Sequence, residues 1–395
     1  MKILMLTPYL PYPLYSGGQI RSYNLLKHLS VNHKITLFSF IREEKERVYA
    51  KSLKKFCQKV VLIKRRRAWD LRNIFLSILT PYPFLVAIYL SRSLRRRLTR
   101  ELSSANYDLI HAETFYVMPN LPAVSAPVLL VEQTIEHLVY QRFVENFKFA
   151  PLKPLLYFDV FKIKLWEKYF WQKASRLAAM SEADKKIMAK TVKDKPVDVV
   201  ANGVDIDYFA KTPSIKGGRL TVLFVGNFKW LPNKDAALFL TRKIWPKIKQ
   251  KLPRTKLWIV GRNPTTQILA LKDQKDVNVT GDLKDIRQAF SRASVLLAPI
   301  RNGRGTKYKV LEAMASSVPV VTTALGIEGI AAKNNQAVLV AETASDLAQK
   351  TLKLLTRPKL AKKISSNAKK LILSRYNWKI ISQDLDKIYQ EMGKN

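Results

Sequence analysis

The stretch LTVLFVG, residues 220–226, decides the fold, because it restarts a pattern that the first half of the chain has already shown once. It is a short apolar run closed by a glycine, and a helical pattern follows it. The first such run spans residues 3–7, and short apolar runs alternate with helical patterns from there onward. Strands that alternate with helices are typical of parallel sheets with helices on both faces. The restart therefore predicts an α/β chain with two Rossmann-like domains.

The length of the chain also favours two domains. At 395 residues it exceeds the size at which a single hydrophobic core stops growing. The expected strands are residues 3–7, 34–40, 59–63, 109–112, 128–132 and 176–180 in the first domain, and 220–226, 256–260, 277–280, 295–298 and 319–322 in the second. We predict an N-terminal domain over residues 1–205, a linker over 206–218, a C-terminal domain over 219–375 and a C-terminal helix over 376–395. In the helix after Gly226, we expect Asn233 as the N-cap and a kink at Pro246.

Charge and cysteine content restrict the function classes. The chain has 69 Lys and Arg against 30 Asp and Glu, a formal net charge of +39, which predicts a polyanionic environment. Nucleic acid, an acidic membrane surface and phosphorylated substrates all fit, and charge alone does not choose among them. Cys57 is the only cysteine, which excludes a disulfide framework and a cysteine-based zinc cluster and fits a reducing, cytoplasmic compartment. The first residues are typical of a buried strand and not of a signal peptide.

Residues 73–90 form an uncharged run of eighteen residues between two basic clusters, at 64–67 and 92–100. The run has the minimum length for a bilayer span, but Pro81 and Pro83 interrupt its centre, so we expect no span. Two interpretations stay open. The segment lies in the headgroup layer of an anionic membrane, or it forms a buried helix pair beside solvated arginines.

A glycine-spaced cationic turn at residues 301–307 opens a predicted helix that ends near residue 315. Backbone N–H groups at a helix start, together with the positive end of the helix dipole, favour phosphate binding. Arg304, Lys307 and Lys309 add positive charge, and Glu312 offers a carboxylate suited to a pair of sugar hydroxyls. Cations for a diphosphate and a carboxylate for a ribose predict a nucleotide-sugar pocket. The alternative is a solvated basic turn before an ordinary buried helix.

Polar residues and glycines at strand ends of the first domain are further site candidates. Gly17 and Gly18 follow the first strand, where paired glycines let the backbone approach a ligand closely. Gln133 and Glu136 follow a later strand, and Glu136 is a candidate general base or hydroxyl ligand. The other polar residues at these strand ends are His111, Glu113 and His137. A structural turn and satisfied loop residues are the competing interpretations.

Several familiar motifs are missing from the chain. It has neither a complete P-loop nor a Gly-x-Gly-x-x-Gly fingerprint after its first strand, which counts against an ATPase and a nicotinamide enzyme. Asp205-Ile206-Asp207 spells Asp-x-Asp, a pattern that many metal-dependent sugar transferases use. Because it follows a turn in the predicted linker, we assign no metal to it.

The motifs together resemble the family-four retaining glycosyltransferases with the GT-B fold, and the resemblance spans nearly the whole chain. Its donor half is carried by Gly303-x-Gly305-Thr306, by KVLEAMA at 309–315, by Pro319-Val320-Val321-x-Thr323 and by Gly326-x-Glu328-Gly329. The remaining matches are the Gly17-Gly18 loop, Ser181, NGVD at 202–205, FVG at 224–226, Trp230-x-Pro232-Asn233 and VGR at 260–262.

The resemblance implies two Rossmann-like domains that face each other across a cleft, with the C-terminal helix crossing back to the N-terminal domain. It also implies that Glu312, the second Glu of the family's Glu, seven residues, Glu signature, binds the donor ribose. The first Glu of that signature falls on Arg304, which puts the usual sugar contacts in doubt.

Two further departures concern the donor diphosphate and the acceptor. The family usually shows an Arg and a Lys after the glycine at 226, where this chain has Asn227 and Pro232-Asn233; Lys229, Lys307 and Lys309 are expected to supply the missing charge. Relatives often show a His three residues before a Glu on the acceptor side. Here the pair is Gln133 and Glu136, so the role of the His is lost or belongs to His137.

We therefore predict a metal-independent glycosyltransferase of the hexosyltransferase type with no cofactor besides its nucleotide diphosphate sugar donor. The expected catalytic residues are Glu136, Gln133 and Lys309, and the expected donor-binding residues are Gly17, Gly18, Gly226, Lys229, Arg304, Gly305, Thr306, Lys307, Lys309 and Glu312. The expected partners are a glycan or lipid-linked acceptor and an anionic membrane surface at the inner, cytoplasmic face, with no specific nucleic acid. A nucleotide-sugar epimerase, a nucleic-acid-binding protein and an inactive homologue remain alternatives.

Overall fold

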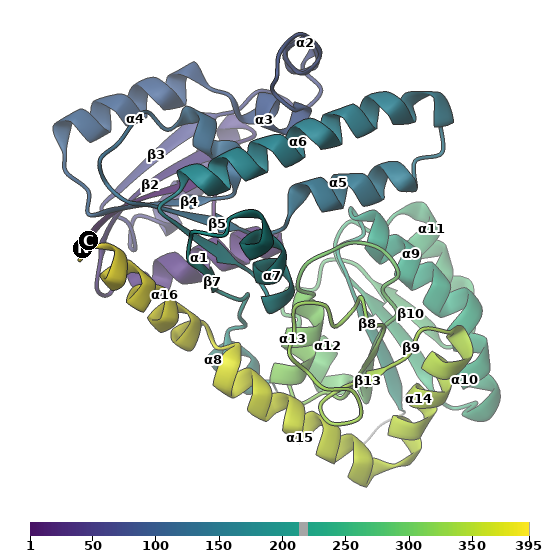
Figure 1. Cartoon of the computed structure of the whole chain (residues 1–395). Coiled ribbons are helices and arrows are strands. Elements are labelled where there is room, and N and C mark those ends of the chain that lie inside the picture. The colour runs from purple at the N-terminus through teal and green to yellow at the C-terminus, as the bar shows by residue number, and fades with distance from the viewer. Residues whose placement is uncertain (213–219, 395) are drawn as a thin grey trace. The chain divides into compact units, whose positions relative to one another are not determined.

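The computed structural model describes residues 1–212 and 220–394 and divides the chain into two compact units (Figure 1). The first unit is Met1–Ala201 together with Ile381–Asn395, and the second is Asn202–Ile380. The segment expected as a linker begins with helix α8 (Ile206–Ala210), and its part from residue 213 to 218 lies outside the described residues.

The first unit is built on a seven-stranded, fully parallel sheet in the order β3-β2-β1-β4-β5-β6-β7. Its strands are β1 (Lys2–Thr7), β2 (Lys34–Ile41), β3 (Lys59–Lys64), β4 (Leu109–Glu113), β5 (Val128–Glu132), β6 (Arg176–Ala179) and β7 (Val197–Val199). Six of the seven match the expected strands; β7 was not predicted, because three residues are too few to show a pattern. The chain order reverses between β1 and β4, and the carboxyl ends of strands at such a switch point are where open α/β sheets bind ligands.

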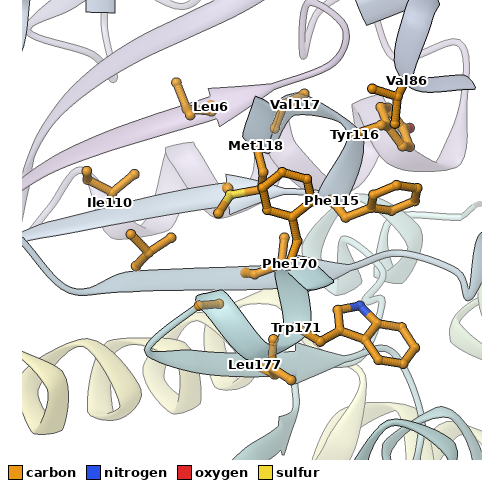
Figure 2. Close-up of a cluster of buried hydrophobic side chains, with 14 of the residues drawn as sticks. Leu6, Val86, Ile110, Phe115, Tyr116, Val117, Met118, Phe170, Trp171 and Leu177 are labelled. Carbon is orange, nitrogen blue, oxygen red and sulfur yellow. The ribbon is translucent and has the colours of Figure 1, made fainter. Parts of the chain in front are cut away.

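Helices cover both faces of this sheet. They are α1 (Gly17–Leu29), α2 (Leu71–Leu79), α3 (Phe84–Tyr89), α4 (Arg92–Ser104), α5 (Glu136–Glu145), α6 (Lys153–Lys173) and α7 (Glu182–Thr191), with 3-10 turns at Glu44–Ser52, Phe115–Asn120 and Ala150–Leu152. Figure 2 shows how Phe170 and Trp171 of α6 lie with Phe115 among the strand residues Leu6 and Ile110. This packing removes large apolar side chains from water, which is the main favourable contribution to folding.

The uncharged run at 73–90 forms two short helices, α2 and α3, separated by the residues around Pro81. Helix α3 is buried, as the helix-pair interpretation expects, whereas α2 leaves most of its apolar side chains exposed. Within the part of the chain that the structure describes, no helix is long and apolar enough to cross a membrane.

The C-terminal helix α16 (Trp378–Met392) joins the first unit, as expected from the resemblance. Asp386 accepts a hydrogen bond of 2.8 Å from His33, and Glu391 accepts one of 2.6 Å from Arg176. The hydroxyl of Tyr389 contacts the ring Nδ1 of His111 at the centre of the sheet. Polar contacts along its length therefore attach the last helix to the first sheet.

The second unit is built on a six-stranded parallel sheet in the order β10-β9-β8-β11-β12-β13. Its strands are β8 (Thr221–Val225), β9 (Lys256–Val260), β10 (Val277–Thr280), β11 (Val295–Ala298), β12 (Val320–Thr322) and β13 (Leu339–Val340). The first five match the expected strands, and the two-residue β13 was not predicted. Its helices, besides α8, are α9 (Leu231–Phe239), α10 (Trp245–Lys251), α11 (Thr266–Leu269), α12 (Arg287–Arg292), α13 (Tyr308–Ala315), α14 (Ala344–Thr356) and α15 (Pro358–Arg375), with a 3-10 turn at Ala270–Asp273.

The helix after β8 differs from the expectation at its start. It begins at Leu231 with Trp230 as the N-cap, so the assignment of Asn233 as N-cap is wrong. Pro232 occupies the first turn, where its missing N–H costs no hydrogen bond. A π-helical segment at Leu240–Ile244 lies directly before Trp245-Pro246. Proline removes a backbone donor from a helix interior, and the π-segment is the local adjustment at the position where the kink was expected.

Candidate functional site

The cationic turn before α13 has the backbone shape that an anion site requires. Gly303 and Gly305 have φ values of +94° and +81°, in the left-handed region where side chains are disfavoured. The turn ends at Lys307, the N-cap of α13, which makes no side-chain capping hydrogen bond. The N–H of Val310 donates to the Lys307 carbonyl at 2.9 Å. The positive end of the helix dipole at this start favours an anion.

Lys309 and Glu312, three residues apart on α13, are partly buried groups whose charges are poorly compensated. Burial lowers the pKa of Lys309 to about 7, and the neighbouring charge of Lys307 lowers it further while Glu312 opposes the shift. Burial also raises the pKa of Glu312 to about 7, against the charge of Lys309. The Lys309 ammonium donates a hydrogen bond of 2.6 Å to Asn233 Oδ1 and lies 4.5 Å from the centre of the Phe224 ring. Groups perturbed in this way are typical of ligand sites.

A second carboxylate, Glu328, faces the same turn. Its oxygens lie 4.0 Å from Arg304 Nε and 3.9 Å from Lys307 Nζ, at the outer limit of an ion pair. Glu328 Oε2 and the hydroxyl of Thr306 are buried without a hydrogen-bond partner. The sequence analysis assigned no role to Glu328, although it lies in the Gly-x-Glu-Gly motif that carries part of the resemblance.

Close contacts of glycine backbone hold the carboxyl ends of β8 and β9 together in the second sheet. A Cβ atom on Gly261 would lie 1.6 Å from the carbonyl oxygen of Gly226, so residue 261 must be glycine. A Cβ atom on Gly226 would lie 3.0 Å from Cγ of Asn233, the partner of Lys309. Lys229 is exposed in the turn after β8, and its backbone N–H donates to Asn227 Oδ1 at 3.0 Å. Gly226 is thus packed against the Lys309 site, whereas Lys229 lies at the surface.

In the first unit, a fully buried polar cluster surrounds Glu113 at the end of β4. Arg21 Nε lies 3.4 Å from Glu113 Oε1, His111 Nε2 lies 3.2 Å from the same oxygen, and Gln133 donates to Oε2 at 2.7 Å. Burial alone raises the pKa of Glu113, but the charge of Arg21 and the hydrogen bonds from His111 and Gln133 outweigh it and lower the pKa to about 2. Glu113 is therefore ionised, with one hydrogen bond at each carboxylate oxygen and the charge of Arg21 beside it.

The Gly17-Gly18 turn lies directly against this cluster. Tyr9 donates its hydroxyl to Gln133 Oε1 at 2.6 Å. A Cβ atom on Gly18 would lie 1.8 Å from the Tyr9 hydroxyl and 2.7 Å from Gln133 Oε1, so a side chain at residue 18 would have to displace these two side chains. Gly17 begins α1, whose N-cap Ser16 makes no capping hydrogen bond with its side chain. Both ends of the Gln133 amide are engaged, so this residue positions its neighbours.

Glu136 begins α5 in a separate acidic group. Glu167 of α6 accepts hydrogen bonds from the backbone N–H groups of Glu136 and His137, at 2.6 and 3.2 Å, and also contacts the His137 ring. Burial and the nearby charge of Glu167 raise the pKa of Glu136 to about 7. Thr134 donates to Glu136 Oε1 at 3.0 Å. Glu136 thus has a pKa suited to a proton-transfer group, while His137 is held by Glu167.

In the first unit, Glu136 therefore lies in a different polar group from Gly17, Gly18 and Gln133, and in the second unit the predicted residues other than Lys229 lie together. Gly17, Gly18, Gln133 and Glu136 lie at the strand ends of the first sheet, and Gly226, Arg304, Gly305, Thr306, Lys307, Lys309 and Glu312 lie around the start of α13. Among the residues that the structure describes, no group of three or more His, Cys, Asp or Glu side chains could hold a metal ion. The fold and these groups define a two-unit α/β protein with a cationic glycine turn before helix α13 of its second unit.

Comparison with known proteins identifies the family. The chain belongs to the glycosyltransferases: residues 15–208 match the model of Glycosyltransferase Family 4, and residues 219–357 match that of Glycosyl transferases group 1. It is therefore an enzyme that transfers sugars, and its two parallel-sheet units are those of the GT-B fold.

Individual relatives agree with this assignment. A 44.6 kDa protein in the cps region of Klebsiella pneumoniae is 23% identical over 98% of this chain and 99% of its own. A phosphatidyl-myo-inositol mannosyltransferase of Mycobacterium leprae is 24% identical, over 80% of this chain and 82% of its own length. The crystal structure of HepE from Anabaena, in complex with UDP and glucose, superposes with a TM-score of 0.63 at 14% identity and covers 99% of this chain and 100% of that one.

Proposed function

We propose that the enzyme moves a hexose from a nucleotide diphosphate sugar to a glycan or lipid-linked acceptor, with retention of the anomeric configuration. The observation that carries this proposal is the pair Lys309 and Glu312 on α13, beside the glycine turn. A partly buried ammonium at the positive end of the helix dipole suits a diphosphate, and a carboxylate one turn along the helix suits the two hydroxyls of a ribose.

The chemistry assigned to the second unit is electrostatic. Lys307, Lys309 and the N–H groups at the start of α13 would stabilise negative charge on the departing diphosphate as the glycosidic bond breaks. Preorganised donors in a partly buried site contribute about 3 kcal/mol each to such a step. In this proposal the lysines and backbone amides stabilise the departing diphosphate, and neither a metal nor a cofactor takes part.

The chemistry assigned to the first unit concerns the acceptor. Glu136, with a pKa of about 7, would act as general base or hydroxyl ligand for the acceptor. Gln133 would hold the Gly17-Gly18 turn and Glu113 in place.

The proposed acceptor and location follow from charge and from two relatives. The basic clusters at 64–67 and 92–100 suit an anionic membrane surface, and they support the inner, cytoplasmic face as the proposed location. One relative is named as a phosphatidyl-myo-inositol mannosyltransferase, and another is named for its place in a cps region. These names support synthesis of a cell-envelope glycan or exopolysaccharide on a lipid-linked acceptor.

The donor proposal is tested by thermal shift with a panel of nucleotide sugars. A true donor at about one hundred times its dissociation constant stabilises the protein by roughly 2.7 kcal/mol. Glu312→Ala should abolish this shift, while Glu342→Ala, which removes an exposed carboxylate of the same unit, should keep it. An unchanged shift in Glu312→Ala would overturn the ribose assignment, and the absence of a shift with every nucleotide sugar would overturn the proposal.

A further inference from the structure

Exposed apolar side chains of the first unit concentrate on two helices, α2 and α6. More than half of the large exposed hydrophobic side chains in the described residues lie between residues 69 and 79 or between 143 and 169. On α2, Phe75, Ile78 and Leu79 are 58%, 60% and 76% exposed. On α6, Phe158 and Phe161 are 57% and 53% exposed. Exposed apolar side chains that gather on a few elements are unlike the single scattered ones of an ordinary surface and indicate an interaction site.

Three hydrogen-bonding side chains of α6 fasten the end of α2 and the following turn to one face of that helix. Asp159 accepts from Ser77 Oγ at 3.2 Å, Lys162 donates to the carbonyl of Tyr82 at 3.0 Å, and Trp166 Nε1 donates to the carbonyl of Pro81 at 2.9 Å. The exposed residues Ile78 and Phe158 are sequence neighbours of the bonded pair Ser77 and Asp159. The end of α2 and the turn after it are therefore attached to α6 by hydrogen bonds.

A cavity of about 460 Å³ lies farther along α6, between that helix, the 3-10 turn at Phe115–Asn120 and Arg95 of α4. Its walls include Tyr82, Trp166 and Tyr169, and its lining includes the cations Arg95 and Lys173. A groove of about 600 Å³ on α4 continues from Arg95 along the arginine face of that helix. Aromatic walls with two cations fit an anionic amphiphile, whose phosphate would meet Arg95 and Lys173 while its apolar part lies on the rings.

We propose that the α2–α6 surface, together with the cavity beside Arg95 and Lys173, docks on a bilayer that contains anionic phospholipid. Apolar and aromatic side chains with interspersed Lys and Arg are typical of surfaces that lie in a headgroup layer. The formal charge of +39 favours an anionic membrane over a second copy of the chain, because like charges repel. This inference adds the docking surface to the proposed membrane location, and it depends on the proposed function only for its biological purpose.

The test is cosedimentation of the full chain with vesicles of phosphatidylcholine, with and without phosphatidylglycerol. We expect binding only to the anionic vesicles. Arg95→Ser with Lys173→Ser should weaken it roughly twenty-five-fold, since each cation near an anionic surface contributes about a factor of five. The matched control is Lys362→Ser with Lys363→Ser, which removes the same charge from the exposed side of α15 and should change binding far less.

The apolar part is tested by Phe75→Ser with Phe158→Ser, against Val48→Ser with Leu373→Ser as exposed apolar controls. The first pair should weaken binding roughly tenfold or more, because each buried aromatic ring contributes a favourable transfer energy. Equal effects of test and control pairs, or binding that is independent of lipid charge, would overturn the proposal. So would concentration-dependent dimerisation that is lost in Phe75→Ser with Phe158→Ser, since a second copy would then be the occupant. Donor-induced thermal shifts should be unchanged in all variants, which separates this outcome from the proposed function.

A different observation carries a second inference, on the donor itself. Glu328 Oε2 and the Thr306 hydroxyl are buried without hydrogen-bond partners, and a Cβ atom on Gly329 would lie 3.0 Å from that hydroxyl. Buried polar atoms without partners are rare and costly. Glu328 lies 4.0 Å from Arg304 and 3.9 Å from Lys307, and the proposed function assigns Lys307 to the diphosphate.

We infer that Glu328 accepts hydrogen bonds from hydroxyls of the donor sugar, the part of the ligand beyond the diphosphate. A carboxylate is acceptor-only and suits a pair of sugar hydroxyls. Arg304 occupies the position where a carboxylate was expected from the resemblance, and Glu328 is the carboxylate that lies next to it. This inference rests on the proposed function, because it requires a nucleotide sugar at the turn.

Glu328→Gln separates the sugar from the nucleotide. Titration calorimetry should show roughly tenfold weaker binding of the nucleotide sugar found in the panel, while binding of its nucleoside diphosphate stays equal or tightens. Glu328→Asp should restore part of the loss, and Glu342→Gln, at an exposed carboxylate that bonds to the same loop through Ala324 N, should change neither. Equal losses for both ligands, or no loss, would overturn the role of Glu328. Failure of the unaltered enzyme to bind any nucleoside diphosphate would overturn the proposed function and this inference with it.

Discussion

Glu113 in the first unit and Glu312 in the second are both shielded carboxylates beside a cation, yet their pKa values differ widely. Glu113 has Arg21, His111 and Gln133 around it, and its pKa is about 2. Glu312 has the charge of Lys309 as its opposing influence, and its pKa is about 7 because burial dominates.

The difference separates structural from ligand-binding groups. A buried charge that has an opposite charge and hydrogen bonds beside it favours one arrangement of the fold, and removing one partner leaves the other uncompensated. A shielded charge that lacks compensation costs free energy in the protein without ligand. A bound ligand can supply the missing opposite charge or hydrogen bonds. We therefore interpret the Glu113 cluster as structural and the Lys309 and Glu312 pair as the donor site.

The largest effect on stability is expected from a substitution in the Glu113 cluster. Glu113→Gln leaves Arg21 buried without its counter-charge and should lower the free energy of unfolding by about 3–5 kcal/mol. The measurement is urea unfolding at pH 7. In Arg21→Met with Glu113→Leu both charges are gone, and we expect part of the loss to be recovered. A loss below about 1 kcal/mol in Glu113→Gln, the level of an ordinary neutral hydrogen bond, would contradict the structural interpretation.

Glu312→Gln should raise the free energy of unfolding, whereas Glu113→Gln should lower it. The folded pKa of Glu312 is raised from 4.5 to about 7, so the stability that this group contributes is present below pH 4.5 and lost as pH rises through 7. The amide mimics the protonated acid, and at pH 8 it should raise the free energy of unfolding by about 1–3 kcal/mol. The gain should vanish near pH 4.5, and donor binding should be lost. A variant less stable than the parent at pH 8 would contradict the comparison with Glu113.

Donor affinity should show a maximum near pH 7, because both groups titrate there in the free enzyme. A bound diphosphate keeps Lys309 charged, so affinity falls above pH 7, where the free lysine is neutral. A bound ribose keeps Glu312 ionised, so affinity falls below pH 7, where the free acid is protonated. On each side of the maximum, donor affinity should fall by up to about tenfold for each pH unit.

Binding titrations between pH 5 and 9 test this profile, and Lys309→Arg is the matched variant. Arginine stays charged throughout that range, so the alkaline limb should disappear while the acidic limb remains. A flat profile in the unaltered enzyme would contradict the assignment of both groups to the donor.

The smallest effect is expected at the edge of the Glu113 cluster. Tyr9→Phe removes the hydrogen bond to Gln133 and should cost about 1 kcal/mol of unfolding free energy. Gly18→Ala should cost more in the parent than in Tyr9→Phe, because the added Cβ atom meets the tyrosine hydroxyl first. Urea unfolding measures both losses of unfolding free energy. If Gly18→Ala cost the same in the parent and in Tyr9→Phe, the packing of the Gly17-Gly18 turn against the Tyr9 hydroxyl would be contradicted.

Most of the strand pattern could be predicted because it is local. Runs such as Val128–Glu132 and Lys256–Val260 carry the apolar character of buried parallel strands and match the structure residue for residue. Strands of two or three residues, such as Leu339–Val340, carry no such pattern. The N-cap at Asn233 was wrong because Trp230 and Pro232 start the helix earlier, and the amide of Asn233 is used instead by Lys309.

The sequence by itself determined the α/β class, the glycine turn and the pairing of Lys309 with Glu312, since these depend on residues close together in the chain. Only the tertiary structure decided the state of the charges and their long-range partners. Tyr389 contacts His111 across 278 residues, Glu328 reaches the turn of Arg304 from the loop after β12, and α2 is fastened to α6 at Asp159. Packing creates these contacts and the burial that shifts the pKa values. Neither burial nor contact between distant residues can be predicted from the local spacing of residues in the sequence.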